Sequence, residues 1–283
     1  MGSDTENALK REARNLLKKG DVDLVLGYCM EGDNVIPCFI SSPGEVDGLV
    51  WNNRCKNNLA VYLRELEGRV AVVAKGCDSR AIVELLKAKQ VEREDLIILG
   101  VSCRGMVDKE GEEYGSCRVC LHRNPVVYDL FVGEKVSERE ERDVDELESL
   151  SLRERLEFWS KQFRKCINCL ACRNVCPMCF CEECVLEKKD PEWITRAGDA
   201  SNLFLLHAIK ATHMAGRCVE CGECERACPV DIPLMHLYSR VCRDVEELFG
   251  VESGMNLEDK PPLAAFDLER DAMLEENEKN KRG

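Results

Sequence analysis

The cysteines of this chain are grouped at spacings that suit iron–sulfur chemistry. Residues 166–184 read CINCLACRNVCPMCFCEEC and hold seven cysteines in nineteen residues. The first four follow the pattern C-x2-C-x2-C-x3-C-P, and residues 218–229 repeat it as CVECGECERACP. Three thiolates spaced two residues apart on a tight loop can ligate three irons of one cubane, and the fourth cysteine, beside the proline, is carried to the other cluster.

The doubled pattern therefore predicts two 4Fe-4S clusters with crossed ligands, as in a two-cluster bacterial ferredoxin. Zinc is the alternative for any single C-x2-C pair, but two complete runs favour iron and sulfide. We call the two predicted ligand sets the cluster-1 cysteines (Cys166, Cys169, Cys172 and Cys228) and the cluster-2 cysteines (Cys218, Cys221, Cys224 and Cys176).

Three further cysteines, Cys179, Cys181 and Cys184, are surplus to these two sets. One interpretation makes them part of a further metal site, completed by a ligand from elsewhere in the chain or from a partner. The other makes them buried structural thiols beside the clusters. Three cysteines in six residues favour the first interpretation slightly, whereas Cys242 stands alone and is expected to be structural.

The N-terminal half has its own cysteines at the ends of expected strands. Cys77 follows the strand expected over 69–76, and Cys103 follows the one expected over 95–102. The carboxyl ends of parallel strands meet at one sheet edge, which the SCRVC loop could reach. The predicted set, the first-domain cysteines, comprises Cys77, Cys103, Cys117 and Cys120, with Cys55 as an alternative ligand. Four thiolates suit a 4Fe-4S cluster or zinc. The two remaining cysteines of this half, Cys29 and Cys38, are expected to be core residues inside strands.

The elements around these cysteines predict an α/β fold: an open, mostly parallel sheet domain, followed by an alpha-helical two-cluster ferredoxin-like domain. Apolar β-branched runs alternate with helical patterns, which indicates a β-α-β unit. Helices are expected over 3–18, 57–66 and 79–90, and strands over 23–28, 35–40, 69–76, 95–103 and 125–136.

The domain boundaries follow from composition. An α/β domain spans 1–137 and an acidic linker running into a helix spans 138–159, where nine acids face four arginines over 138–157. A dicluster domain spans 160–250, and a charged tail, 251–283, is expected to order only against a partner. Inside the dicluster domain, residues 201–216 predict a helix that carries His207 and His213, which are expected to be packed or solvated rather than ligands.

Composition limits the function classes. The chain has 283 residues, 19 cysteines and a formal net charge of −13, and no basic stripe, so nucleic-acid binding is not expected. It has no long apolar run and no apolar leader, so we expect no membrane span and a cytoplasmic protein. In that compartment, abundant cysteine indicates metal ligation rather than disulfides.

Two resemblances refine this interpretation. Residues 213–234, HMAGRCVECGECERACPVDIPL, and the wide separation of the two runs resemble the alpha-helical ferredoxin arrangement of heterodisulfide reductase C subunits and succinate dehydrogenase iron–sulfur subunits. Residues 69–136, with AKGC at Cys77, GVSC at Cys103 and YDLFVG after the C-x2-C pair, resemble the beta subunits of deazaflavin-coenzyme-reducing hydrogenases and related formate dehydrogenases. This second resemblance implies FAD and one 4Fe-4S cluster, although no flavin-binding run stands out.

These observations favour an iron–sulfur electron-transfer subunit of an anaerobic redox complex. It would hold three 4Fe-4S clusters, or four with the surplus cysteines. The resemblance implies partner subunits of the hydrogenase, formate dehydrogenase or heterodisulfide reductase kind. Two alternatives stay open, a flavin-containing subunit that itself oxidises or reduces a deazaflavin or nicotinamide, and a zinc-stabilised binding module. No acid–base or nucleophile motif stands out, so we expect no independent catalytic residues.

Overall fold

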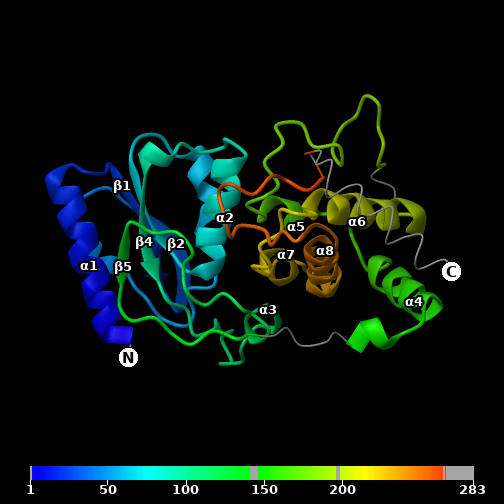
Figure 1. The fold of residues 1–283 in the computed structure, drawn as a ribbon, viewed down its shortest axis with the longest axis horizontal. Coiled ribbons are helices and arrows are strands. Elements are labelled where there is room, and N and C mark those ends of the chain that lie inside the picture. Colours follow the sequence, from blue (N-terminus) through cyan, green and yellow to red (C-terminus); the bar gives the residue numbers. More distant parts are fainter. Residues whose placement is uncertain (1, 141–145, 196–197, 264, 266–283) are drawn as a thin grey trace.

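The computed structural model describes residues 2–140, 146–195, 198–263 and 265, and it contains an α/β half and a helical half (Figure 1). One five-stranded sheet forms the α/β half, in the order β2-β1-β3-β4-β5. Only β1 and β2 pair antiparallel, and the other neighbours are parallel. The predicted fold class is confirmed. The strands are β1 (Leu24–Glu31), β2 (Asn34–Ile40), β3 (Val70–Ala74), β4 (Leu96–Val101) and β5 (Leu130–Val132).

The sheet has this topology because its central strands are apolar on both faces. Every residue of β3, VAVVA, is buried, as expected for a parallel strand covered by helices. Helix α1 (Gly2–Lys19) contacts β1 and β5, and helix α2 (Gly76–Lys87) contacts β3 and β4. The two helices lie on opposite sides of the sheet, with α2 facing the helical half (Figure 1).

The helix predicted over 57–66 is a 3-10 helix, η2 (Leu59–Glu65). Its start is fixed by side chains from elsewhere, because Glu223 accepts from the backbone N–H of Asn58 and Asp78 accepts from that of Leu59. These long-range bonds occupy donors that a regular helix start leaves open. The remaining short elements of this half are η1 (Glu45–Gly48), η3 (Arg93–Asp95) and α3 (Gly115–Arg118).

Cys29 and Cys38 correct one expectation. Both lie inside strands and pack, partly buried, against the core as expected, but they form a disulfide between β1 and β2, although metal ligation rather than disulfides was expected of the cysteines. In the strand register Cys38 lies opposite Gly27 and Cys29 lies opposite Ile36, so the two cysteines are diagonal neighbours. Diagonal side chains on paired strands are within mutual reach, which sequence spacing alone did not reveal.

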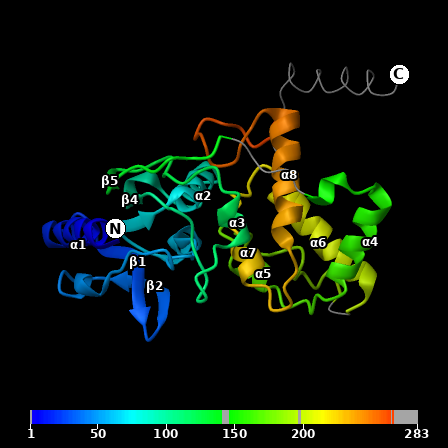
Figure 2. The same ribbon diagram turned by 90° about the horizontal axis from the view of Figure 1, so that it is seen from below.

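The helical half is built around α6 (Ala200–Met214), which contacts α4 (Leu152–Phe163) and α8 (Leu234–Phe249). Ser151 and Glu154 form a capping box at the start of α4, and Asp199 caps α6 through the N–H groups of Ser201 and Asn202. Figure 2 shows α4 and α6 together at the end of the molecule far from the sheet. The other helical elements are η4 (Glu146–Ser149), α5 (Ala171–Asn174) and α7 (Glu223–Arg226).

The chain after α8 returns to the first half, which corrects the expectation of a free tail from residue 251. Ser253 is buried, and its carbonyl oxygen accepts two bonds from the Arg80 guanidinium, at 2.9 and 2.8 Å. Glu252 approaches Arg80 at 3.4 Å and His122 at 2.7 Å. Figure 1 shows this segment crossing from α8 to α2. The tail residues expected to anchor a partner, Phe266, Leu268, Met273 and Leu274, lie outside the described residues.

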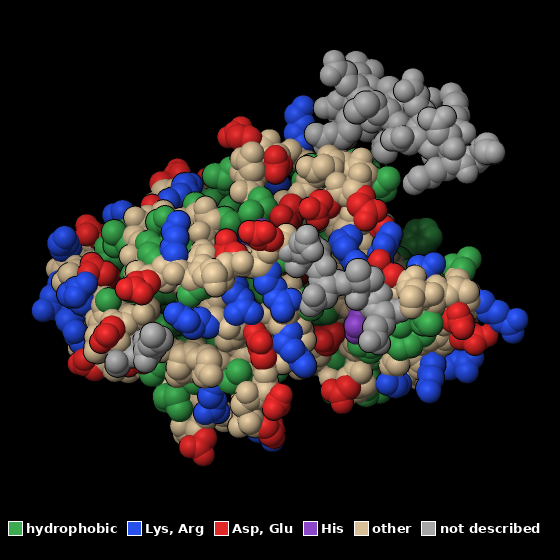
Figure 3. All heavy atoms as spheres, turned by 60° about the horizontal axis from the view of Figure 1, so that its bottom comes forward, with side chains coloured by type: hydrophobic (Ala, Val, Ile, Leu, Met, Phe, Trp, Pro, Cys, Tyr) green, Lys and Arg blue, Asp and Glu red, His purple; other side chains and the backbone are tan. Residues whose placement is uncertain are grey.

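Charged side chains of both signs are intermixed over the face shown in Figure 3, rather than gathered into one patch of a single sign. Among the described residues, no helix has the length and apolar character needed to cross a bilayer.

Candidate metal centres

The two cysteine runs adopt the same local backbone. In each run the second residue after the first cysteine is left-handed, Asn168 with φ 53° and Glu220 with φ 55°, and so is the fourth, Leu170 with φ 57° and Gly222 with φ 73°. These turns aim the N–H of Asn168 at Cys166 Sγ and that of Glu220 at Cys218 Sγ, both at 3.4 Å. Backbone N–H groups directed at sulfur stabilise thiolates, which are the ligands of iron.

The cluster-1 cysteines surround one pocket. Cys166, Cys169, Cys172 and Cys228 line it, with Leu206 and His207 of α6 forming its inner wall. The backbone N–H of Ile232 donates to Cys228 Sγ at 3.4 Å. Burial raises the pKa of Cys172 to about 11. The structure thus brings Cys228 of the second run to the three leading cysteines of the first.

The cluster-2 cysteines surround a second pocket. Cys218, Cys221 and Cys224 line it together with Cys176 of the first run. Lys210 and Met214 of α6, Tyr238 of α8 and Glu223, which pairs with Arg226, also line it. Helices α5 and α7, which follow the two loops, contact each other, so the fourth cysteine of each run lies beside the loop of the other.

The first-domain cysteines converge as the sheet-edge argument predicts. Cys77, Cys103, Cys117 and Cys120 line a third pocket, which includes Lys75, Arg123 and also Cys221 of the helical half. The backbone at Gly76 passes so close to the loop that a Cβ there would lie 2.0 Å from the carbonyl oxygen of His122. Burial raises the pKa of Cys103 to about 12. Because Cys221 lines both pockets, the first-domain and cluster-2 sites are neighbours.

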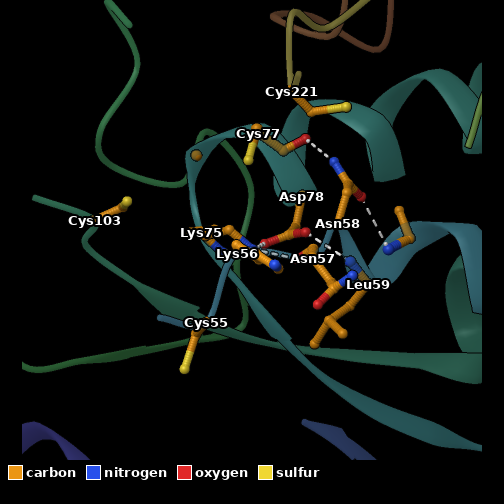
Figure 4. Close-up of polar contacts among 12 residues, drawn as sticks. Cys55, Lys56, Asn57, Asn58, Leu59, Lys75, Cys77, Asp78, Cys103 and Cys221 are labelled. Carbon is orange, nitrogen blue, oxygen red and sulfur yellow. Dashed lines mark hydrogen bonds and ion pairs between the residues drawn. The ribbon is translucent and has the colours of Figure 1, made fainter. Parts of the chain in front are cut away.

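Cys55 does not join this site. It is fully buried but does not line the third pocket, and it lies within 3.8 Å of the carbonyl oxygen of Val50. Figure 4 shows its sulfur directed away from Cys77 and Cys103. The structure therefore does not group Cys55 with the four first-domain cysteines.

The surplus cysteines are not gathered into one site. The Cys179 thiol donates to the sulfur of Cys176, and this bond, larger than the opposing effect of burial, lowers the pKa of Cys176. Cys181 is exposed, and Cys184 packs beside Leu186, Ile194 and Leu206 in a separate small cluster. Cys242 is buried on α8, 3.5 Å from the carbonyl oxygen of Cys218. No three His, Cys, Asp or Glu side chains of the described part of the chain are grouped as ligands of a single metal ion.

The polar atoms of three buried side chains around the first two pockets have no hydrogen-bond partner among the described residues. They are both ring nitrogens of His207, Nζ of Lys210 and the hydroxyl of Tyr238. An unpaired buried polar group costs about 1–3 kcal/mol, so such groups imply a ligand. Anionic sulfur of a 4Fe-4S cluster could accept a bond from the one N–H of the His207 ring, from the Lys210 ammonium and from the Tyr238 hydroxyl. Four thiols surround each pocket, so the residues present fit the group. His213, the other histidine of α6, is exposed.

A buried polar network lies beneath Cys77. Lys75 Nζ contacts Asp78 at 2.8 Å, the Tyr28 hydroxyl at 2.5 Å and the carbonyl oxygen of Asn57 at 2.6 Å. Burial disfavours the ammonium, but Asp78 and then Tyr28 outweigh it, so the pKa of Lys75 lies well above its usual value. The Asn58 amide donates to the carbonyl oxygen of Cys77 at 3.1 Å (Figure 4). This network was not predicted from the sequence, although Lys75, directly after the buried strand β3, was a signal.

The α/β half and the helical half contact each other through Asn58, Glu223 and Arg226. The backbone N–H of Asn58 donates to Glu223 at 2.8 Å. Glu223 also pairs with Arg226 at 2.9 Å, and Arg226 donates to the carbonyl oxygen of Lys56 at 3.2 Å. Asn58 thus contacts both Cys77 of the first-domain site and Glu223 in the cluster-2 loop.

A cavity of about 630 Å³ adjoins the first-domain site on the side of the helical half. Cys77 and Cys120 line it at one end, and Phe158, Leu121 and Met235 supply apolar walls. Its cationic groups are Arg80, Arg118 and Arg243, and His122 and His236 also line it. The size falls in the range of cavities that hold organic ligands. Its lining could not be predicted from the sequence, because Phe158 of α4 and four residues of α8 meet residues of the first half there.

Comparison with known proteins agrees with this geometry. The family model of the 4Fe-4S dicluster domain matches residues 162–232, the segment that carries both cysteine runs. The chain is 26% identical to a protein of Methanocaldococcus jannaschii named F420-dependent formate dehydrogenase subunit beta, over 94% of this chain and 98% of the relative. It is 23% identical to F420-dependent formate dehydrogenase 1 subunit beta of Methanococcus maripaludis, over 88% of this chain and 90% of the relative.

The first alignment runs over 380 positions, whereas this chain has 283 residues, so the relative contains segments with no counterpart here. The expected resemblance is confirmed. The chain resembles the beta subunits of F420-dependent formate dehydrogenases over nearly its whole length and carries a 4Fe-4S dicluster domain.

Proposed function

We propose that this protein is an iron–sulfur electron-transfer subunit that holds three 4Fe-4S clusters in a row. One observation carries the proposal: each of three pockets is lined by one complete predicted set of four cysteines, and the first-domain pocket is also lined by Cys221 of the cluster-2 set. Cys221 lines both the first-domain and the cluster-2 pocket, and the crossed runs join the cluster-2 and cluster-1 pockets. The supporting dicluster match covers the two runs.

A 4Fe-4S cluster supplies one-electron transfer, and the protein residues hold and shield it. The four thiolates of each pocket are the ligands, and the backbone N–H groups of Asn168 and Glu220 orient two of them. Leu206, Met214 and Tyr238 exclude water from the cluster-1 and cluster-2 pockets. Because water is excluded, the reduction potentials of the clusters respond strongly to nearby charges.

The row ends at the surface near the cluster-1 pocket. Cys169 is exposed there, and Ile167, in the same loop, is 63% exposed. An apolar side chain beside a redox site suits docking of a protein that exchanges electrons. We place the contact with another redox subunit at this loop. The candidate partner subunits are a catalytic dehydrogenase or hydrogenase and a heterodisulfide-reductase-like or flavin protein. The names of the relatives favour a formate dehydrogenase.

The seventeen cysteines outside the disulfide favour a reducing compartment, in which thiolates remain available to iron. The cytoplasm of an anaerobe meets this requirement.

A second candidate function is favoured by the 630 Å³ cavity. In this second function, the subunit itself oxidises or reduces a flavin or deazaflavin coenzyme that binds in the cavity beside Cys77 and Cys120. Apolar walls suit a planar ring system, and Arg118 and Arg243, the latter also paired with Glu148, suit its anionic groups. Binding of a deazaflavin coenzyme to the iron-loaded protein, weakened in Arg243→Met but unchanged in Arg153→Met on the exposed side of α4, would support this function. Equal binding by both variants would contradict it.

The leading proposal is tested by anaerobic purification of the full chain with metal and sulfide analysis. About twelve irons and twelve acid-labile sulfides per chain are expected, four of each per cubane. Cys117→Ser and Cys221→Ser should each lose one cluster signal by electron paramagnetic resonance, whereas Cys242→Ser should retain all iron. A content of about eight irons per chain would mean that the first-domain site holds no cluster. Zinc without acid-labile sulfide would instead support a zinc-stabilised binding module.

A further inference from the structure

Helix α6 places one buried polar side chain at each pocket of the dicluster domain. His207 lines the cluster-1 pocket, and Lys210, one turn later, lines the cluster-2 pocket. Residues three apart on a helix lie on the same face. Both side chains are buried, with 1% and 2% of their surfaces exposed.

The two side chains differ in charge. His207 stacks on Phe163, with ring centroids 4.3 Å apart and an interplanar angle of 11°. Burial, with a further contribution from Lys210, lowers the pKa of His207 to about 4, so its imidazole is neutral near pH 7. The cluster-1 pocket therefore faces an uncharged ring.

Lys210 brings a cation to the other pocket. Its Nζ lies 4.9 Å from the centroid of the Tyr238 ring, a cation–π contact. It has no hydrogen-bond acceptor or acidic partner among the residues that the structure describes. Burial disfavours this ammonium, but Cys176 and other groups around the pocket raise the pKa of Lys210 well above its usual value. A buried ammonium without a carboxylate is rare, so it requires an anion from the site itself.

We propose that Lys210 is a positioning residue whose ammonium raises the reduction potential of the cluster held by Cys176, Cys218, Cys221 and Cys224 above that of its neighbour. The inference rests on the proposed function, since it needs a cluster in that pocket. Reduction adds one negative charge to a site that is already anionic through its four thiolates. A cation in a water-poor pocket stabilises the added charge, and nearby charge and hydrogen bonds to sulfur are among the determinants of cluster potentials.

Lys210 also interacts with Cys172 of the cluster-1 set, but it lines only the cluster-2 pocket. The effect on cluster 1 is therefore smaller. The pair of clusters is made unequal, with the electron favoured on the one next to the first-domain site.

The test is an anaerobic redox titration of the iron-loaded full chain, followed by electron paramagnetic resonance. Signals are assigned by their loss in Cys218→Ser for cluster 2 and Cys169→Ser for cluster 1. Lys210→Met keeps the length of the side chain and removes its charge. At a fixed potential, it should lower the reduced-to-oxidised ratio of cluster 2 at least tenfold, or about 59 mV for one electron, with a smaller change at cluster 1.

Lys161→Met, which removes an exposed lysine of α4, is the matched control and should shift neither potential. An unchanged cluster-2 potential in Lys210→Met, or a larger shift at cluster 1, would overturn the inference. If Lys210→Met loses iron, Lys210→Gln and Lys210→Arg replace it. A cluster-2 potential that is lowered in the Gln variant but not in the Arg variant supports the inference. Loss of iron in both neutral variants, with normal iron content in the Arg variant, would overturn it and assign Lys210 to cluster assembly instead. Wild-type protein without two such signals would refute the proposed function itself.

Discussion

Asp78 is the residue on which the buried contacts beneath the first-domain cysteines converge. Its carboxylate accepts bonds from Lys75 Nζ at 2.8 Å, from the backbone N–H of Lys75 at 3.0 Å and from that of Leu59 at 2.8 Å. Both Asp78 and Lys75 are excluded from water, at 0% and 2% exposure. The carboxylate therefore holds the loop before η2 against the turn that carries Cys77.

Asp78→Ala is expected to destabilise the protein by about 3–5 kcal/mol, because it leaves the Lys75 ammonium buried without its counter-ion. Urea unfolding of the anaerobic protein measures the change. Asp47→Ala is the control: its side chain is 81% exposed and pairs with Arg14, so a loss of about 0–1 kcal/mol is expected. Equal losses in the two variants would show that the network contributes nothing beyond a surface ion pair.

Cys176 tests the crossed ligation of the two runs. It lines the cluster-2 pocket, although it belongs to the run whose other three cysteines line the cluster-1 pocket. Cys176→Ser should perturb the resonance of cluster 2 and spare that of cluster 1. Cys179→Ser, next to it but outside both predicted sets, should retain both signals. Loss of the cluster-1 signal in Cys176→Ser would reverse the assignment.

The candidate metal ligands could be predicted from residue type and position in the sequence. The buried charged and polar residues beside the metal sites could not. Local spacing predicted the eight cysteines of the two runs, and the order of parallel strands predicted the first-domain cysteines; the structure places the three sets around three pockets. Lys210 and His207 could not be recognised in the same way. Their significance depends on which face of α6 points to which pocket, and α8 and the two loops decide that.

At the scale of elements, the two cysteine loops share a left-handed turn but differ in what surrounds it. Leu170 and Gly222 hold the same position before α5 and α7. Leu170 shows that a side chain is tolerated at that backbone geometry. Gly222 is in a tighter place, because a Cβ there would lie 2.2 Å from Ser116 Oγ of the first half. The glycine is therefore required by the approach of the two halves.

Gly222→Ala should destabilise the protein by more than about 1 kcal/mol, since it adds both a clash and backbone strain at positive φ. Denaturant unfolding measures the loss, and the cluster-2 signal should broaden as the loop shifts. Gly44→Ala provides the control, because its φ is −75° and a Cβ there meets nothing within 4 Å. A loss in Gly222→Ala no larger than that in Gly44→Ala would contradict the close-approach argument.

Elements whose boundaries depend on local pattern were predicted well. The strand over 69–76 is β3 (Val70–Ala74), and the helix over 201–216 is α6 (Ala200–Met214). The strand predicted over 125–136 is shorter in the structure, where β5 covers only Leu130–Val132. Two other exceptions involve distant partners. The predicted helix at 57–66 is the 3-10 helix η2, at whose start Asp78 and Glu223 accept backbone N–H bonds. The cysteines of β1 and β2, expected as core residues, form a disulfide because strand register makes them neighbours.

At the scale of the whole molecule, the segment after α8 has two parts with different roles. Residues 251–254 are held by α2, where Gly254 N–H donates to Glu84 at 2.7 Å and Arg80 donates to Ser253. Charge composition did not predict this, because Arg80 and Glu84 are far from residue 253 in sequence. Pro262 also lies against Gly216. The chain beyond residue 265 lies outside the described residues, and its docking to a partner subunit stays a prediction.

Truncation after residue 265 should leave cluster content and unfolding midpoint unchanged and weaken recovery of partner subunits in anaerobic pull-downs. Truncation after residue 250 should in addition lower the unfolding midpoint, because it leaves the buried Arg80 guanidinium without the Ser253 carbonyl and Glu252. Equal partner recovery by full-length protein and the first truncation would refute docking by the tail. Equal stability of the two truncations would refute the role of residues 251–254.

The return of residues 251–254 to α2 also changes what the acidic linker is for. Because the halves are joined at Ser253 and Arg80, and again at Glu223 and Asn58, the peptide bonds around residues 141–145 are not their only connection. Two separately translated polypeptides, 1–140 and 146–283, should therefore reassociate and co-elute with a full complement of iron. In evolutionary terms, such a protein could be split into two genes, or assembled by fusing two, without losing the path between its redox sites.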